Sequence, residues 1–144
     1  MNAEAELKVI DVDVHNDLRS HAVLLPYLAE PWRSRVAKSG FGQLSGGYWS
    51  PVGVFRQDCL PPAGGPPASD PDYLVKDLIE PYHIQYAVLT GSLSNISISY
   101  DPDFAAAVCS AYNDYLIAEW LPRHPSFKGA MLIASQDPLL AAKE

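Results

Sequence analysis

Three Asp-Pro dipeptides divide the second half of the chain, and they constrain its fold more than any other feature. They begin at Asp70, Asp101 and Asp137, and an apolar stretch follows each one. An aspartate carboxylate accepts the unpaired N–H groups of a first helical turn, and proline suits the first helical position because it has no N–H to leave unpaired. Each dipeptide therefore predicts the start of a helix.

Short runs of β-forming residues precede these helices. We predict strands near residues 7–14, 86–92 and 128–134, as parallel neighbours in that order joined by right-handed crossovers. The runs Ala-Val-Leu and Met-Leu-Ile in the last two are continuously apolar, so we expect both faces of the sheet to be covered. The fold class that follows is α/β, with about three parallel βα units resembling the first part of a (β/α)₈ TIM barrel.

The spacing of the dipeptides, 31 and 36 residues, is close to the roughly 31 residues per unit of such a barrel. An open Rossmann-like sheet would show a similar spacing. We treat residues 1–144 as a single domain.

A long irregular insertion, residues 16–69, follows the first strand. The stretch 21–36 has room for one or two short helical turns, whereas residues 40–68 are dense in glycine and proline. Long loops in compact domains are commonly functional lids. We therefore predict that residues 40–68 are mobile and lie over the C-terminal ends of the strands.

Composition excludes several classes of partner. Hydrophobic residues make up 48% of the chain, which is enough for a core of its own. The 17 acidic and 10 basic residues give a net charge of −7, and the bases are scattered, which argues against nucleic acid and against anionic membranes. The sequence has no signal-peptide pattern and no run long enough to span a bilayer, so we expect a cytoplasmic protein with a small-molecule substrate. Cys59 and Cys109 lack metal-site spacing, and we expect free thiols.

Residues 9–17, Val-Ile-Asp-Val-Asp-Val-His-Asn-Asp, place polar groups at alternate positions of an apolar segment. In an extended chain Asp11, Asp13 and His15 point to one side. An oxygen and an imidazole nitrogen two residues apart can reach one divalent ion at about 2.0 to 2.2 Å each. The alternative is a polar cluster without metal, in which a carboxylate caps a turn and His15 is hydrogen-bonded to a carboxylate.

The sequence resembles the amidohydrolase-related (amidohydrolase 2) family of metal-dependent TIM-barrel hydrolases and decarboxylases. The resemblance rests on VIDVDVH at the first strand, LLPYLAEPWR soon after it, and the stretch from AYNDYLIAEW to the end of the chain, and it covers the N-terminal portion of such a barrel. The first strand of that family commonly ends in His-x-His, two metal ligands. Asp13 and His15 occupy these positions here, and Asp11 lies one pleat deeper.

The resemblance implies metal-assisted hydrolysis or decarboxylation of a small cyclic or carboxylated substrate. The implied cofactor is a divalent metal, zinc, with manganese as the alternative. The family's remaining ligands come from later strands. This chain alone is therefore expected to bind metal poorly and to turn over little or nothing.

Histidine positions support that expectation. His83 and His124 fall between a helix and the following strand, which predicts the N-terminal end of the sheet, and His21 is expected to open a short helix. Barrel closure would need a missing C-terminal partner segment, and an exposed sheet edge would favour self-association.

Weaker candidates surround the Asp13–His15 pair. Thr90 and Ser92 end the second strand, where they can contact substrate or satisfy backbone groups. A second group of candidates in the insertion could line a substrate pocket or form a partner surface, and it consists of Tyr48, Trp49 and Arg56. Asn113 and Asp114 are expected on a solvated helix face.

Two other functions compete with the enzyme. One is a non-catalytic interaction or assembly protein derived from a barrel fragment. The other is an open-sheet nucleotide-binding domain, which the absence of a Gly-x-Gly-x-x-Gly or P-loop motif disfavours.

Overall fold

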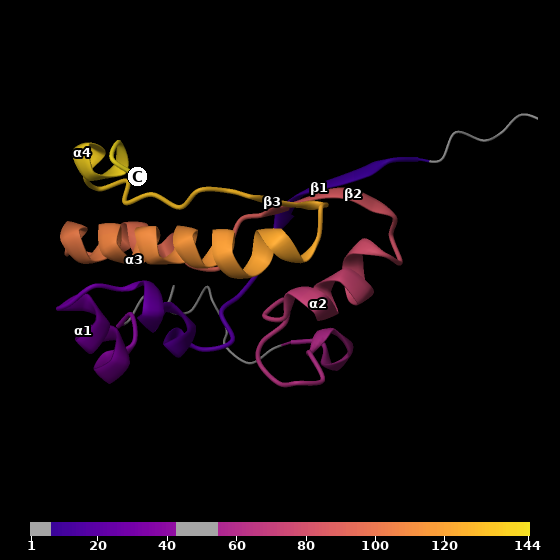
Figure 1. Ribbon diagram of the computed structural model, residues 1–144, viewed down its shortest axis with the longest axis horizontal. Coiled ribbons are helices and arrows are strands. Elements are labelled where there is room, and N and C mark those ends of the chain that lie inside the picture. Colours follow the sequence, from indigo (N-terminus) through magenta and orange to yellow (C-terminus); the bar gives the residue numbers. More distant parts are fainter. Residues whose placement is uncertain (1–6, 43–54) are drawn as a thin grey trace, which may run out of the picture.

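The computed structural model describes residues 7–42 and 55–144. Its sheet contains three parallel strands in the order β1 (Val9–Val14), β2 (Ile84–Leu89) and β3 (Phe127–Gly129) (Figure 1). The predicted α/β class, strand order and parallel pairing are confirmed. The third strand is shorter than predicted, since pairing with β2 ends at Gly129.

Helices begin at all three Asp-Pro dipeptides. The carboxylate of Asp70 accepts the N–H of Tyr73 at 3.0 Å, and that of Asp101 accepts the N–H of Phe104 at 3.0 Å. Asp137 accepts two such N–H groups, at 2.9 and 3.0 Å. The helices that follow are α2 (Pro71–Leu74), α3 (Pro102–Tyr115) and α4 (Pro138–Ala141).

Shorter helical segments complete the chain. Single π-helical segments extend α2 and α3, namely η4 (Val75–Ile79) and η6 (Leu116–Trp120), and η7 (Leu121–Arg123) follows the second. The insertion after β1 begins with η1 (His21–Tyr27) and α1 (Trp32–Ser39), as its sequence predicted, and later contains η3 (Gln57–Cys59). Between β2 and α3 lies η5 (Ser94–Ile98).

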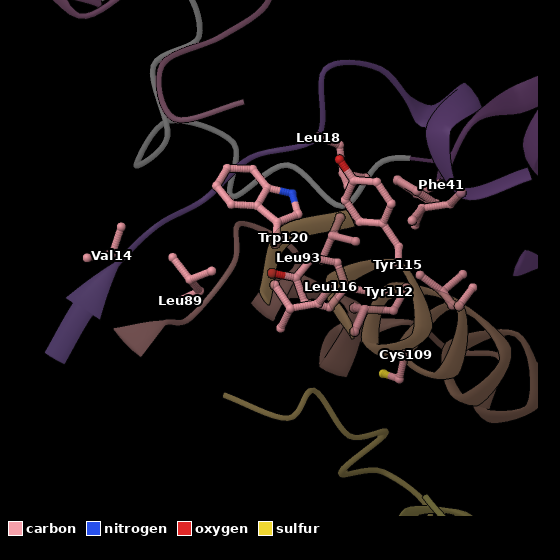
Figure 2. Close-up of a cluster of buried hydrophobic side chains, with 14 of the residues drawn as sticks. Val14, Leu18, Phe41, Leu89, Leu93, Cys109, Tyr112, Tyr115, Leu116 and Trp120 are labelled. Carbon is pink, nitrogen blue, oxygen red and sulfur yellow. The ribbon is translucent and has the colours of Figure 1, made fainter. Parts of the chain in front are cut away.

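The core lies between the sheet and α3 with its η6 extension. Tyr112 and Trp120 are fully buried there and pack with sheet residues that include Leu89 (Figure 2). Both α2 and α3 lie on the same side of the sheet (Figure 1). This arrangement places the principal core on one face only.

The opposite face of the sheet is exposed, and the prediction that both faces are covered is wrong for the described chain. Ile10 is 55% exposed, Val12 66% and Tyr86 39%. The reason is that the helices of successive crossovers pack on one side, so nothing in the described chain covers the other.

The ends of the strands carry the residues that the sequence assigned to them. His83 directly precedes β2 and His124 lies shortly before β3, so both are at the N-terminal end of the sheet, as predicted. The N–H of Asp17, just after β1, donates to the carbonyl of Ala68 at 2.8 Å, so the last part of the insertion returns to the C-terminal end of that strand. Within the described ranges no helix is long and apolar enough to cross a membrane. Cys59 and Cys109 are free thiols, as expected.

Candidate functional site

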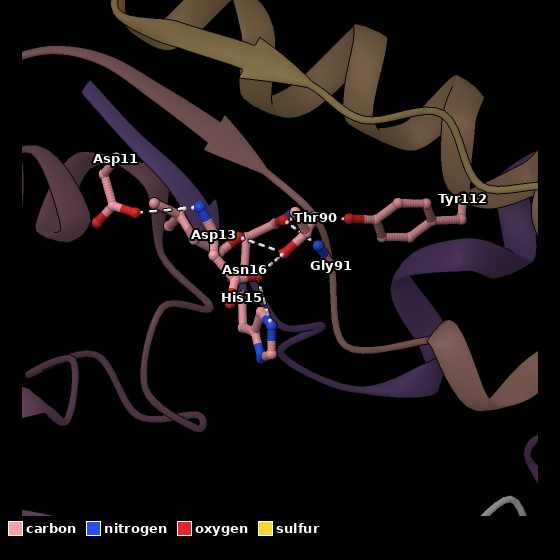
Figure 3. Close-up of polar contacts among 8 residues, drawn as sticks. Asp11, Asp13, His15, Asn16, Thr90, Gly91 and Tyr112 are labelled. Carbon is pink, nitrogen blue, oxygen red and sulfur yellow. Dashed lines mark hydrogen bonds and ion pairs between the residues drawn. The ribbon is translucent and has the colours of Figure 1, made fainter.

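The Asp13–His15 pair lies at the C-terminal end of β1. The Nε2 atom of His15 is 2.9 Å from Oδ1 of Asp13, and the two side chains are 68% and 71% exposed (Figure 3). Asp11 contributes to the backbone instead, since its Oδ1 accepts the N–H of Asp13 at 3.1 Å. The structure therefore brings together the two predicted ligands, and Asp11, the third polar residue of the segment, binds the local backbone.

The spacing of the pair fits one divalent cation. Ligands at 2.0–2.1 Å from a tetrahedral zinc lie roughly 3.3 Å apart, so a cation needs only a small outward shift of these two atoms. The same hydrogen bond is also what the alternative polar cluster predicts. Among residues 7–42 and 55–144, no three His, Cys, Asp or Glu side chains form a group that could hold a metal.

Thr90 contacts the pair from the end of β2. Its hydroxyl lies 3.3 Å from Oδ1 of Asp13 and 3.3 Å from the carbonyl oxygen of Val14, and it can donate to either. Its backbone N–H donates to the Val14 carbonyl at 2.9 Å. Thr90 thus both fixes the strand end and orients the candidate ligand.

Ser92, two residues after Thr90, hydrogen-bonds to a different acid. Its hydroxyl donates to Oδ1 of Asp17 at 2.5 Å, and the same oxygen accepts the N–H of Leu18 at 2.7 Å. Ser92 therefore hydrogen-bonds to Asp17 and not to the Asp13–His15 pair.

The insertion candidates are placed differently. Arg56 pairs with Asp58, and the hydroxyl of Tyr73 in α2 donates to the Asp58 carbonyl at 3.1 Å. In the part of the chain that the structure describes, none of the Arg56 hydrogen bonds reaches the Asp13–His15 pair. Tyr48 and Trp49 lie outside the described residues.

Sequence reasoning missed Asn16. This residue is 1% exposed, and its Oδ1 accepts two hydrogen bonds, from the N–H of Gly91 at 3.0 Å and from the hydroxyl of Tyr112 at 3.1 Å. Burial raises the pKa of Tyr112 to about 12, so its hydroxyl keeps its proton to donate. An asparagine that follows a strand resembles an ordinary loop residue in the sequence. The one available signal was position, because Asn16 lies two residues after β1 and Gly91 lies two residues after β2.

A cavity of about 360 Å³ is lined by Asp17, the residue after Asn16. Its charged and polar lining includes Arg19 and His21, and apolar walls come from Leu18, Phe41 and Leu93. The ring of His21 meets that of Phe41 edge to face at 4.5 Å. A second cavity of about 370 Å³, beside the end of α3, shares no lining residue with the first.

No family model matches the chain, and no curated protein matches it. The resemblance to the amidohydrolase-related family therefore remains an expectation.

Proposed function

We propose that Asp13 and His15 hold one divalent cation, zinc or manganese, for the hydrolysis or decarboxylation of a small carboxylated or cyclic substrate. The observation that carries the proposal is the 2.9 Å separation of Asp13 Oδ1 and His15 Nε2 at the C-terminal end of a parallel strand. Enzymes built on parallel βα units place their sites at this end, where the loops gather. A bound cation would polarise a substrate oxygen or lower the pKa of a water.

The neighbouring residues have distinct roles in this proposal. The Thr90 hydroxyl orients the carboxylate of Asp13, and the cavity at Asp17 receives the substrate. Arg19 lines that cavity, and its guanidinium suits a substrate carboxylate. Phe41 and Leu93 suit the apolar part of a substrate. Ser92 orients Asp17, which lines this cavity.

Two protein ligands make a weak site, because catalytic zinc usually has three. We therefore propose that the chain by itself binds metal weakly and turns over little, and that further ligands come from additional chain or from a partner. The cytoplasm remains the proposed compartment, since two free thiols suit reducing conditions.

Calorimetric titration of zinc and of manganese into the full chain tests the assignment. We expect weak one-to-one binding that is lost in Asp13→Asn and in His15→Ala. His83→Ala is the matched control, because that histidine lies at the opposite end of the sheet and its removal should change nothing.

Two results would contradict the proposal. Binding that survives His15→Ala would remove the assigned site. Submicromolar binding accompanied by turnover would keep the site and show that the isolated chain is a complete enzyme.

A second candidate function is assembly without catalysis, which the exposed apolar face of the sheet favours. Ile10, Val12 and Tyr86 form a surface of the kind that marks protein association. In this alternative the Asp13–His15 hydrogen bond is a polar cluster and the sheet face is the functional surface.

A further inference from the structure

Beyond the β1–β2 ladder, side-chain hydrogen bonds continue to join the two chain segments. Three successive bonds link residues 13–17 to residues 90–92: Thr90 to Asp13, the N–H of Gly91 to Asn16, and Ser92 to Asp17. The middle bond is the only buried one of the three. The candidate metal pair therefore lies on a segment that β2 holds from the side.

Asn16 closes a ring through this contact. It follows His15 in the chain, and Gly91 follows Thr90, whose hydroxyl contacts Asp13. The hydrogen bond between His15 and Asp13 completes the circuit (Figure 3). Each link of this circuit is covalent or hydrogen-bonded, so the circuit connects Asn16 to both candidate ligands.

The ring is anchored to the core by Tyr112 of α3. The Tyr112 side chain is fully buried and donates its hydroxyl to the same Asn16 oxygen that Gly91 uses. Gly91 has a φ of +73°, and a Cβ added there would overlap the Tyr112 hydroxyl. Only glycine lets this N–H and this hydroxyl reach one acceptor together.

The buried side-chain amide of Asn16 lowers the stability of the fold if its only role is packing. Its Nδ2 is buried with no hydrogen-bond partner among the described residues, and a buried unpaired donor is destabilising. An apolar side chain at this position would not carry that cost. What the amide supplies is one oxygen that accepts from two different elements.

We propose that Asn16 is a positioning residue, which sets the separation of Asp13 and His15 by tying the end of β1 to Gly91 and, through Tyr112, to α3. The expected effect on zinc affinity rests on the proposed function. The expected effect on amide hydrogen exchange does not depend on it. Residues that hold ligands in place commonly change metal affinity by about 10- to 100-fold when they are removed.

The test compares two buried tyrosines of one helix in the full chain. Tyr112→Phe removes only the hydroxyl that contacts Asn16, and Tyr115→Phe is the matched control because Tyr115 is also buried in α3. We expect Tyr112→Phe to weaken zinc binding about tenfold, and Tyr115→Phe to leave it unchanged whatever its effect on melting temperature. Asn16→Ala should weaken binding at least as much, and the double variant Asn16→Ala/Tyr112→Phe no further than Asn16→Ala alone.

Amide hydrogen exchange of Gly91 and Thr90, followed by NMR without metal, gives the independent readout. Faster exchange at both amides in Tyr112→Phe but not in Tyr115→Phe supports the proposal. If the wild-type chain binds no zinc, the proposed function fails, and exchange alone then decides the role of Asn16. Equal exchange in the two tyrosine variants, or zinc affinity that is the same in Asn16→Ala and the wild type, would overturn it.

Discussion

The side-chain amide of Asn113 binds the backbone of Leu132 as a neighbouring β-strand would. Its Nδ2 donates to the Leu132 carbonyl at 2.9 Å, and its Oδ1 accepts the Leu132 N–H at 2.9 Å. Asn113 is 8% exposed, so the expectation of a solvated face is wrong for it, while Asp114 is exposed as expected. The chain after β3 leaves the sheet and runs along α3, and this covers the helix face (Figure 1).

Replacing Asn113 should therefore destabilise the fold. Asn113→Ala removes both bonds and leaves two backbone groups of Leu132 without this partner. It also removes the bond that Nδ2 donates to the Glu144 carboxylate at 2.7 Å, and we expect a total loss of about 2 kcal/mol in urea unfolding. Asp114→Ala, one residue away on the exposed face, should cost less than about 0.5 kcal/mol. Equal losses in the two variants would show that the Asn113–Leu132 contact contributes little.

Gly91→Ala should be among the most damaging small substitutions in the chain. The positive φ costs about 1–2 kcal/mol, and the contact with Tyr112 adds about as much, so we expect about 3 kcal/mol in total. Gly42→Ala is the control, because Gly42 has a φ of +76° with nothing near its Cβ position. In a Tyr112→Phe background the cost of Gly91→Ala should fall only in part, because the ring carbon Cζ, 2.7 Å from the added Cβ, remains after the hydroxyl is removed. An unchanged cost would show that the overlap with the hydroxyl contributes nothing.

The helix cap at Asp101 should make stability depend on pH in the acid range. The N–H of Phe104 first, and then the guanidinium of Arg35, hold the pKa of Asp101 below its usual value of 3.8. A carboxyl group with a lowered folded-state pKa stabilises the fold above its unfolded value, and that stabilisation is lost as pH falls through the folded value. The difference in melting temperature between wild type and Asp101→Asn should thus be largest near neutral pH and shrink below about pH 4. A difference that grows on acidification would contradict this assignment.

The two cysteines should react at very different rates. Burial raises the pKa of Cys109 to about 11, whereas Cys59 is partly exposed. The thiolate is the reactive form, so at pH 8 iodoacetamide should label Cys59 first and Cys109 only on unfolding. Mass spectrometry of digested samples measures both rates, and comparable labelling of the folded chain would show that α3 opens readily.

The exposed sheet face should drive self-association. Val12→Lys places a charge in the middle of this face, and we expect it to shift the chain toward monomer in sedimentation velocity. Leu139→Lys is the control, because Leu139 in α4 is 76% exposed but lies outside the sheet. A wild-type chain that is monomeric at all concentrations would remove the assembly alternative in its self-associating form.

Local rules were enough to predict much of the fold from the sequence. The Asp-Pro dipeptides located three helix starts because an N-cap depends on residues within one turn. Parallel strand order followed from the alternation of strands and helices, and the positions of His83 and His124 at the N-terminal end followed from that order. The Asp13–His15 pair was predictable for the same reason, since residues two apart on a strand share a face.

The rest depends on contacts between residues distant in the sequence, and such contacts leave no local pattern. Asn16 meets Gly91 and Tyr112 across more than 70 residues, and only the packing of α3 against the strand ends makes its oxygen a shared acceptor. In the sequence Asn113 resembles a surface residue, and it is buried because the chain after β3 packs against it. The pairing of β3 with β2 ends at Gly129, before that contact. The two apolar runs that predicted a sheet covered on both sides show only that their side chains are hydrophobic. They do not show which side chains the helices cover. Which face is covered was decided by the side on which the helices pack.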